Sequence, residues 1–201
     1  MTTSLHRVMH GVAIKKHCSA ADIVDLTEMP LAKVESELVA ADASGRLVQA
    51  DGRYMLSPAG HMILLGEYSR FYAGLRSNED FVAAYDRFEI VNNELKQLIT
   101  EWQTIEIAGK RVLNDHSDKE HDDKTIGRLG DLHERFEPIL NTMISGESRL
   151  RCYSKKLESA LEKAEDGESQ WVSSATIESY HTVWFEMHED LLRLLGRVRE
   201  E

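Results

Sequence analysis

Residues 19–41 read Ser-Ala-Ala-Asp-Ile-Val-Asp-Leu-Thr-Glu-Met-Pro-Leu-Ala-Lys-Val-Glu-Ser-Glu-Leu-Val-Ala-Ala, and this stretch decides the fold of the N-terminal part. Its first third has the pattern of a short amphipathic helix, with Ser19 placed to cap it because a hydroxyl accepts an early backbone N–H. Pro30 suits the first turn of the next helix, where a missing N–H costs nothing. The stretch therefore predicts two helices joined by a tight turn, with the second running from Leu31 to Ala41.

A β-hairpin is predicted directly after these helices. Asp51-Gly52 is a strong signal for a two-residue turn, and it separates the short segments Arg46–Gln49 and Arg53–Leu56. Ser57-Pro58 then has the pattern of an N-cap followed by the first residue of another helix. Two helices joined by a turn and followed by a hairpin make a winged helix-turn-helix.

The N-terminal part resembles the winged-helix domain of MarR-type regulators. The residues that carry the resemblance are Gly45-Arg-Leu-Val48, Asp51-Gly-Arg-Tyr54 and Leu56-Ser-Pro-Ala-Gly60, together with a predicted leading helix from about Leu5 to Lys16. The resemblance implies a DNA-reading module over residues 1–70, about a third of the chain. Winged helices also mediate protein contacts, so the resemblance indicates the fold more strongly than the function.

The remainder of the chain, residues 71–201, is predicted to be an all-helical bundle. Apolar residues recur at helical spacing in five segments: His61–Leu75, Asp80–Ala108, His121–Ser145, Ser148–Ala164 and Ala175–Arg199. The predicted fold is therefore mainly α, with a winged helix-turn-helix domain at 1–70 and a helical domain at 71–201 that dimerises and binds a ligand or a partner.

Charge gives DNA binding little support. The net charge is −11, and residues 1–70 carry seven Lys/Arg against eight Asp/Glu, which leaves a net −10 for the rest. A dedicated nucleic-acid binder usually has a basic footprint on its binding domain. Binding to DNA is therefore expected to be weak and sensitive to salt. The candidate DNA contacts are Lys33, Ser36, Arg46, Arg53, Lys15 and Lys16.

A second set of candidates comes from polar and aromatic residues of the helical part, which are typical of a ligand pocket in a bundle. This set is Asn92, Trp102, His116, His133, Tyr180, His181, Trp184 and His188. The alternative for the histidines is burial with a hydrogen bond to Glu or to the backbone. For Asn92 the alternative is an exposed helix position, and for His116 it is a role in capping a loop.

Signatures of catalysis, metal binding and membrane insertion are missing from the sequence. There is no P-loop, no G-x-G-x-x-G, no G-x-S-x-G and no H-E-x-x-H. Cys18 and Cys152 are far apart and are expected to be free thiols. No apolar run approaches the roughly 20 residues that span a bilayer, and the first residues lack the pattern of a signal peptide. We expect a cytoplasmic protein that is not an enzyme and needs no cofactor or metal.

The helical part is also similar to a region of bacterial proteins related to pyruvate phosphate dikinase. The segments that carry this resemblance are Leu95–Trp102, Asn114–Asp118, Arg128–Arg135, Pro138 and Ser179–Leu192. The chain lacks the ATP-binding part, the phosphohistidine motif and the pyruvate-binding barrel of the dikinase. The resemblance therefore implies an accessory subunit for a partner phosphotransferase.

Two functional hypotheses follow. The first is a homodimeric winged-helix transcriptional regulator whose helical part senses a small molecule. The second is a non-catalytic interaction subunit of a dikinase-like phosphotransferase. A metal-sensing regulator, using the histidines of the helical part, is a third and weaker possibility.

Overall fold

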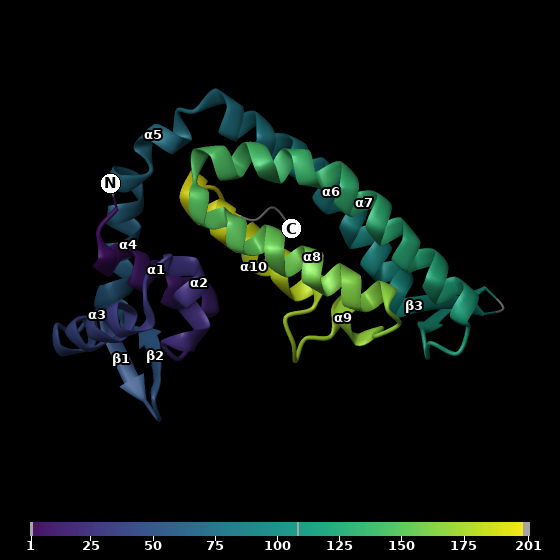
Figure 1. The fold of residues 1–201 in the computed structure, drawn as a ribbon, viewed down its shortest axis with the longest axis horizontal. Coiled ribbons are helices and arrows are strands. Elements are labelled where there is room, and N and C mark those ends of the chain that lie inside the picture. The colour runs from purple at the N-terminus through teal and green to yellow at the C-terminus, as the bar shows by residue number, and fades with distance from the viewer. Residues whose placement is uncertain (1, 108, 199–201) are drawn as a thin grey trace. The chain divides into compact units, whose positions relative to one another are not determined.

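The computed structural model describes residues 2–107 and 109–198. The chain is mainly helical and contains two antiparallel two-stranded hairpins (Figure 1). It divides into two compact units: the first comprises Met1–Glu79, Glu147–Cys152 and Glu186–Glu201, and the second comprises Asp80–Gly146 and Tyr153–Phe185. The predicted boundary between residues 70 and 71 takes no account of the two later segments that return to the first unit.

The first unit begins with helix α1 (Ser4–Lys15), where the Thr3 hydroxyl accepts the backbone N–H of His6. The segment predicted as one helix from Ser19 is a 3-10 turn η1 (Ala21–Ile23) followed by the single helical turn α2 (Val24–Thr27). The predicted Ser19 cap is wrong. The predicted cap has the Ser19 hydroxyl accepting a backbone N–H. Instead, the backbone N–H of Ser19 donates to the Asp22 carboxylate three residues later. Helix α3 (Leu31–Ala43) confirms the next predicted helix.

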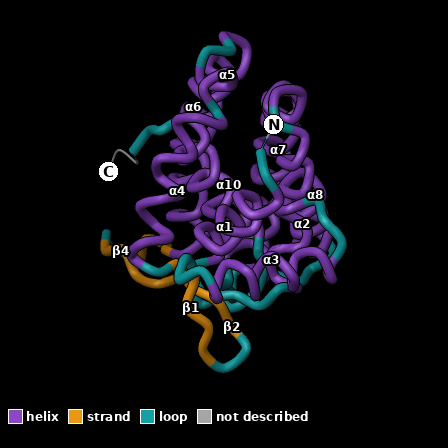
Figure 2. Tube along the Cα trace, turned by 90° about the vertical axis from the view of Figure 1, so that its left-hand side faces the viewer, coloured by secondary structure: helices purple, strands orange, loops and turns teal. Residues whose placement is uncertain are grey.

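The hairpin of strands β1 (Leu47–Ala50) and β2 (Arg53–Leu56) forms as predicted, with Val48 opposite Met55. Asp51 and Gly52 have φ angles of 51° and 77°, as a turn that matches the twist of the strands requires. Figure 2 shows this hairpin as a narrow projection beyond α3.

Helix α4 (Pro58–Phe71) starts where the sequence predicts, because the Ser57 hydroxyl accepts the N–H of Gly60 at 2.9 Å. Gly60 has to be glycine at this place. A Cβ there would lie 1.8 Å from the carbonyl oxygen of Arg46, at the base of the hairpin. The short helix α5 (Ala73–Arg76) follows, so the predicted helix His61–Leu75 is divided in two.

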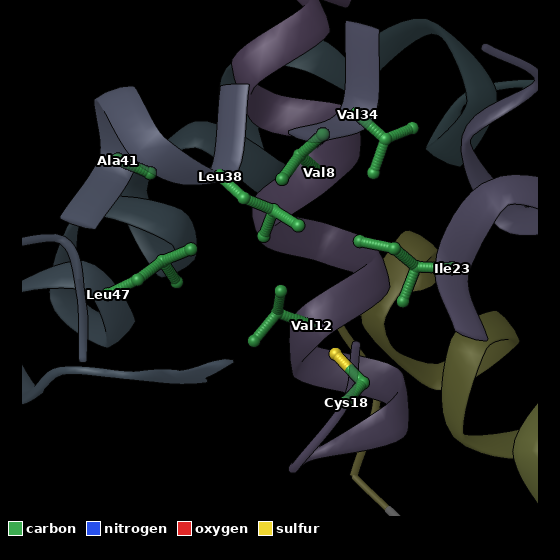
Figure 3. Packing of buried hydrophobic residues seen from close by; sticks show 8 residues of the cluster. All are labelled: Val8, Val12, Cys18, Ile23, Val34, Leu38, Ala41 and Leu47. Atoms are coloured by element: carbon green, nitrogen blue, oxygen red, sulfur yellow. The ribbon is translucent and has the colours of Figure 1, made fainter. Parts of the chain in front are cut away.

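The core of this unit draws apolar side chains from α1, η1, α3 and β1 (Figure 3). Its members are Val8, Val12, Cys18, Ile23, Val34, Leu38, Ala41 and Leu47. Cys18 also exchanges two backbone hydrogen bonds with Tyr54. These bonds connect residues 18–23, which we call the η1 segment, to β2. The same core therefore fixes the positions of α3 and of the hairpin relative to each other.

Two returning segments complete the first unit: the 3-10 turn η2 (Ser148–Leu150) and the last part of helix α10 (Tyr180–Leu195). The guanidinium of Arg76 donates to the carbonyls of Leu194 and Arg193 at the end of α10. Helix α10 begins at Tyr180 and ends at Leu195, so the predicted helix from Ala175 to Arg199 is too long at both ends, and Arg199 itself lies outside the described residues.

The second unit contains the long helices α6 (Glu79–Gln103) and α7 (Lys119–Gly146), helix α8 (Arg151–Glu165), the short α9 (Gln170–Ser173) and the first turns of α10 (Figure 1). The rings of Phe88, Phe136 and Trp184 join α6, α7 and α10, with centroids 4.4 to 5.9 Å apart. The predicted helix His121–Ser145 is confirmed within α7.

The second hairpin corrects a prediction. Helix α6 ends at Gln103, strand β3 (Thr104–Ile107) replaces the last part of the predicted helix, and strand β4 (Lys110–Leu113) follows in a stretch for which no element is predicted. Thr104 and Ile105 are β-branched, which favours a strand, and Gly109 has the φ of 76° that the turn needs. The predicted helix end at Ala108 lies outside the described residues.

None of the helices in residues 2–107 and 109–198 is both long enough and apolar enough to cross a membrane.

Candidate interaction surface

Helix α3, the η1 segment and the first hairpin surround a hollow of ≈ 480 Å³, which we call the α3 groove. It is lined by Ser19, Ala20, Ala21, Leu31, Glu35, Leu38, Val39, Gln49, Gly52 and Tyr54. Glu35 is the one charged residue among these ten. The other nine are small, apolar or neutral, so the groove offers a contact surface that suits an apolar partner.

Apolar side chains extend from the groove onto the exposed surface. Leu31 is 45% exposed and Val39 is 61% exposed, and with Glu35 they share one face of α3 because they are four residues apart. Tyr54 continues this surface on the hairpin, whereas Val48 and Met55 are exposed on the opposite face of the hairpin, because successive side chains of a strand alternate between its two faces. Single exposed apolar residues are ordinary, whereas several on neighbouring elements mark an interaction surface.

The strongest predicted DNA contacts are already neutralised within the chain. The Lys33 ammonium lies 2.7 Å from the Glu37 carboxylate, one helical turn further along α3. The Arg53 guanidinium donates to the carbonyl of His17 and lies 3.5 Å from the Asp22 carboxylate. These pairings lower the positive potential that a phosphate would meet.

The remaining predicted contacts are scattered. Lys15 is only 12% exposed and lies 2.8 Å from the Glu186 carboxylate, so a DNA backbone cannot reach it without breaking that pair. Arg46 is half-buried, and its carbonyl accepts the N–H of Ser57. Lys16, at the end of α1, and Ser36, on α3, are exposed. Of the six predicted DNA contacts, Lys16 and Ser36 are therefore the ones that are exposed with no ion pair shown for them among the described residues.

In the second unit, two predicted ligand residues contact each other directly. The Trp184 indole N–H donates to the Asn92 amide oxygen at 3.0 Å, and the Asn92 amide nitrogen donates to the Glu89 carboxylate at 3.1 Å. Asn92 is 6% exposed, so the alternative of an exposed helix position is wrong. Its polar atoms are satisfied by the chain itself.

Tyr180 and His133 continue this arrangement. The Tyr180 hydroxyl lies 3.2 Å from His133 Nδ1, and the Tyr180 ring stacks on Trp184 with centroids 6.0 Å apart. Burial lowers the pKa of His133 and raises that of Tyr180, so both are neutral at pH 7. His181 is half-buried, and burial lowers its pKa too.

Trp102 and His116 belong to a separate cluster, which fixes the loop after β4. The two rings lie 4.5 Å apart, and His116 Nδ1 lies 3.0 Å from the Asp122 carboxylate. The Asn114 amide donates to the Trp102 carbonyl and to Asp122. This arrangement matches the loop-capping alternative for His116, whose φ of 60° is left-handed.

His188, the last of the eight predicted ligand residues, is buried in the first unit. Six of the eight residues therefore form two clusters in the second unit, His181 lies in that unit outside both clusters, and His188 lies in the first unit, rather than all eight forming the single pocket that the sequence predicts. Asn92, Trp184, Tyr180 and the half-buried His133 form a continuous chain of contacts, which we call the neutral network.

A buried charged network in the first unit has no counterpart in the sequence predictions. The Arg149 guanidinium makes two parallel hydrogen bonds to the Asp190 carboxylate, at 2.5 and 2.6 Å. His10 Nε2 lies 3.0 Å from Asp190 Oδ1, and His10 Nδ1 lies 2.7 Å from the Tyr68 hydroxyl. We call these four residues the charged network. One signal was available: Asp190 falls on the apolar stripe of α10, between Met187 and Leu191.

The protonation states in the charged network follow from its geometry. Burial lowers the pKa of His10 to about 4, so its ring is neutral at pH 7. The Arg149 guanidinium holds the pKa of Asp190 well below its usual range, against the effect of burial. Of the two neutral forms of His10, the one with the proton on Nε2 directs that proton towards the ionised Asp190 carboxylate and leaves Nδ1 to accept the Tyr68 hydroxyl. All four side chains are buried, and the network acts as a structural tie.

In the described part of the chain, neither the cysteines nor the metal-ligating side chains form an arrangement typical of a reactive site. Neither Cys18 nor Cys152 is part of a disulfide, as predicted, and burial raises the pKa of Cys18 to about 11, which keeps it protonated. Within residues 2–107 and 109–198, no three His, Cys, Asp or Glu side chains are grouped as metal ligands.

The α3 groove is therefore the feature that best qualifies as a functional site. Comparison of the chain with known protein families, with curated proteins and with solved structures gives no match.

Proposed function

We propose that the protein is a non-catalytic interaction subunit, whose first unit is a winged helix that binds a protein partner through the α3 groove. The observation that carries the proposal is the lining of the groove, in which nine of ten residues are uncharged and Leu31 and Val39 extend the apolar surface outward. The order of α2, α3, the hairpin and α4 supports the winged-helix assignment.

Electrostatics favour a protein partner over DNA. Binding to DNA gains most of its free energy from cations that neutralise phosphates. Here Lys33 and Arg53 already have carboxylate partners, and Glu35 occupies the middle of the exposed face of α3. An apolar surface with one acidic group instead has the composition of the centre of a protein interface.

The partner that we propose is a dikinase-like phosphotransferase. The support is the resemblance of Asn114–Asp118 and Ser179–Leu192 to a helical region of dikinase-related proteins. In the structure these segments supply Asn114 and His116 of the loop cluster, Tyr180 and Trp184 of the neutral network and Asp190 of the charged network. The second unit then serves as a rigid scaffold, because its polar side chains bond to one another.

The test measures binding of the purified chain to the dikinase-like phosphotransferase of the same organism. Val39→Asp places a charge in the α3 groove and is expected to raise the Kd by about tenfold or more, because burial of a valine is lost. Ala40→Asp is the matched control, since Ala40 is an exposed neighbour that does not line the groove. Absence of a complex, or equal loss in both variants, contradicts the proposal.

A second candidate function is the homodimeric, DNA-binding regulator that senses a small molecule. Lys33 and Ser36 favour it, because both are exposed on α3 and an exposed ion pair costs only about 0–1 kcal/mol to break. A gel shift of the promoter region of its own gene at about 50 mM salt tests this candidate. A shift that Lys33→Ala abolishes and Val39→Asp preserves selects DNA over the protein partner.

A further inference from the structure

We propose that the α3 groove receives an amphipathic helix of the partner, with a Lys or Arg of that helix placed against Glu35. This inference rests on the proposed function, because it names the chemistry of the segment that a protein partner presents. It follows from the dimensions of the groove, from the size of the residues around it and from the state of the Glu35 carboxylate.

The dimensions of the groove suit about two turns of helix. Leu31, Glu35 and Val39 follow one another along α3 at intervals of four residues, which corresponds to about 12 Å at a rise of 1.5 Å per residue. A helix that lies along this row presents side chains at positions i, i+3 or i+4, and i+7. The groove therefore has room for three apolar contacts and one polar contact.

The residues around the groove are small enough to admit a helix backbone. Ser19, Ala20 and Ala21 border it from the η1 segment, and Gly52 borders it from the turn of the hairpin. A Cβ built on Gly52 meets no atom within 4 Å. Tyr54 adds a broad ring on the hairpin side, and aromatic side chains of this kind are common anchors at interfaces.

Glu35 decides the charge of the occupant. Among the described residues it forms no hydrogen bond or ion pair, whereas its neighbours Glu37 and Asp22 are paired with Lys33 and Arg53. An apolar helix that covered Glu35 would strip water from an unpaired carboxylate, which costs free energy unless a cation replaces the water. A basic residue on the incoming helix removes that cost and fixes the register of binding.

The test is a selection with a display library of helical peptides about 14 residues long, varied at the positions of one face. Selection on the full chain is expected to enrich apolar residues at i, i+3 or i+4, and i+7, with Lys or Arg between them. The same selection on Glu35→Lys should enrich Asp or Glu at that position. Exchange of the basic residue for Glu should weaken binding to the wild-type chain by about threefold.

Three outcomes overturn the inference: no enrichment relative to Val39→Asp, enrichment of extended rather than helical sequences, or the same charge preference in Glu35→Lys. The Ala40→Asp variant is the control and should select the same peptides as the wild type. If the phosphotransferase still binds through Val39 while the peptides show no basic preference, the proposed function stands and this inference fails. If a mixed-sequence DNA duplex, and no peptide, binds at α3, both fail.

Discussion

The two buried networks use different chemistry to join distant segments. In the first unit the charged network holds η2 and α10 against α1 and α4 through an ion pair with two hydrogen bonds. In the second unit the neutral network joins α6, α7 and α10 through single hydrogen bonds and stacked rings. Loss of Arg149 or Asp190 leaves an uncompensated buried charge in the first network, whereas loss of Asn92 leaves an unsatisfied dipole in the second.

This difference indicates which contacts contribute most to the free energy of unfolding of each unit. Removing one partner of a buried ion pair typically costs about 3–5 kcal/mol, whereas a buried neutral group left without its partner costs about 1–3 kcal/mol. The stability of the first unit should therefore depend strongly on the ion pair between Arg149 and Asp190. The stability of the second unit should depend on the packing of many side chains. The following experiments, from the largest expected effect to the smallest, test that contrast.

Arg149→Ala should have the largest effect, a loss of about 3–5 kcal/mol in the free energy of unfolding, because Asp190 is left charged and buried. Hydrogen exchange should accelerate in α1 and α4 before α6. Arg151→Ala, an exposed neighbour, is the control and should change little. The double variant Arg149→Met with Asp190→Leu should recover part of the loss, and equal exchange in both units would contradict the contrast.

Acid should weaken the first unit through His10, which faces Asp190, Arg149, Tyr68 and His6. Since burial lowers its pKa to about 4, folding requires the neutral ring. That contribution is complete above pH 6.5, is lost as the pH falls towards 4, and amounts to about 3 kcal/mol. Urea unfolding at both ends of this range should show a steeper pH dependence for the wild type than for His10→Gln; parallel curves would refute the assignment.

Asn92→Leu should cost about 1–3 kcal/mol, because the Trp184 indole N–H loses its acceptor in a buried site. Chemical denaturation measures the loss, and hydrogen exchange should place it in α6 rather than α1. Combining Asn92→Leu with Trp184→Phe removes both polar groups, so the double variant should lose less than the two single variants together. Additive losses would show that the two side chains do not interact.

Tyr180→Phe should have the smallest effect, about 0.5–1.5 kcal/mol, because it removes one hydroxyl at 3.2 Å from His133 and keeps the ring that stacks on Trp184. A small fall in Tm is the measurement. Tyr180→Ala, which also removes the ring, is the comparison and should cost several times more. A fall in Tm as large for Phe as for Ala would show that the hydroxyl, rather than packing, holds the neutral network.

The two hairpins show how far turn chemistry alone predicts the fold. Asp51-Gly52 lies between two short strands and predicts the first hairpin, since few dipeptides take positive φ at both positions. The second hairpin is missed because the apolar stripe of α6 continues to Trp102 and hides the end of the helix. Only Gly109 marks it, and one glycine is a weak signal.

The candidate site divides in the same way. The sequence alone determines most of the element order of residues 1–70, the near-zero charge of those residues and the position of Asn92 on an apolar stripe. These properties depend on turn residues, helical periodicity and composition, all of which act over a few residues. They are enough to predict a mainly helical chain with one hairpin and poor provision for phosphate contacts.

Tertiary structure decided the rest. It joined Arg149 to Asp190 and Trp184 to Asn92, gave Lys15 a partner in Glu186, and placed Glu35 in an apolar groove with no partner among the residues that the structure describes. Each of these outcomes depends on which residues, distant in sequence, become buried together. Burial removes water from polar groups, and only the folded chain determines which group takes the place of that water.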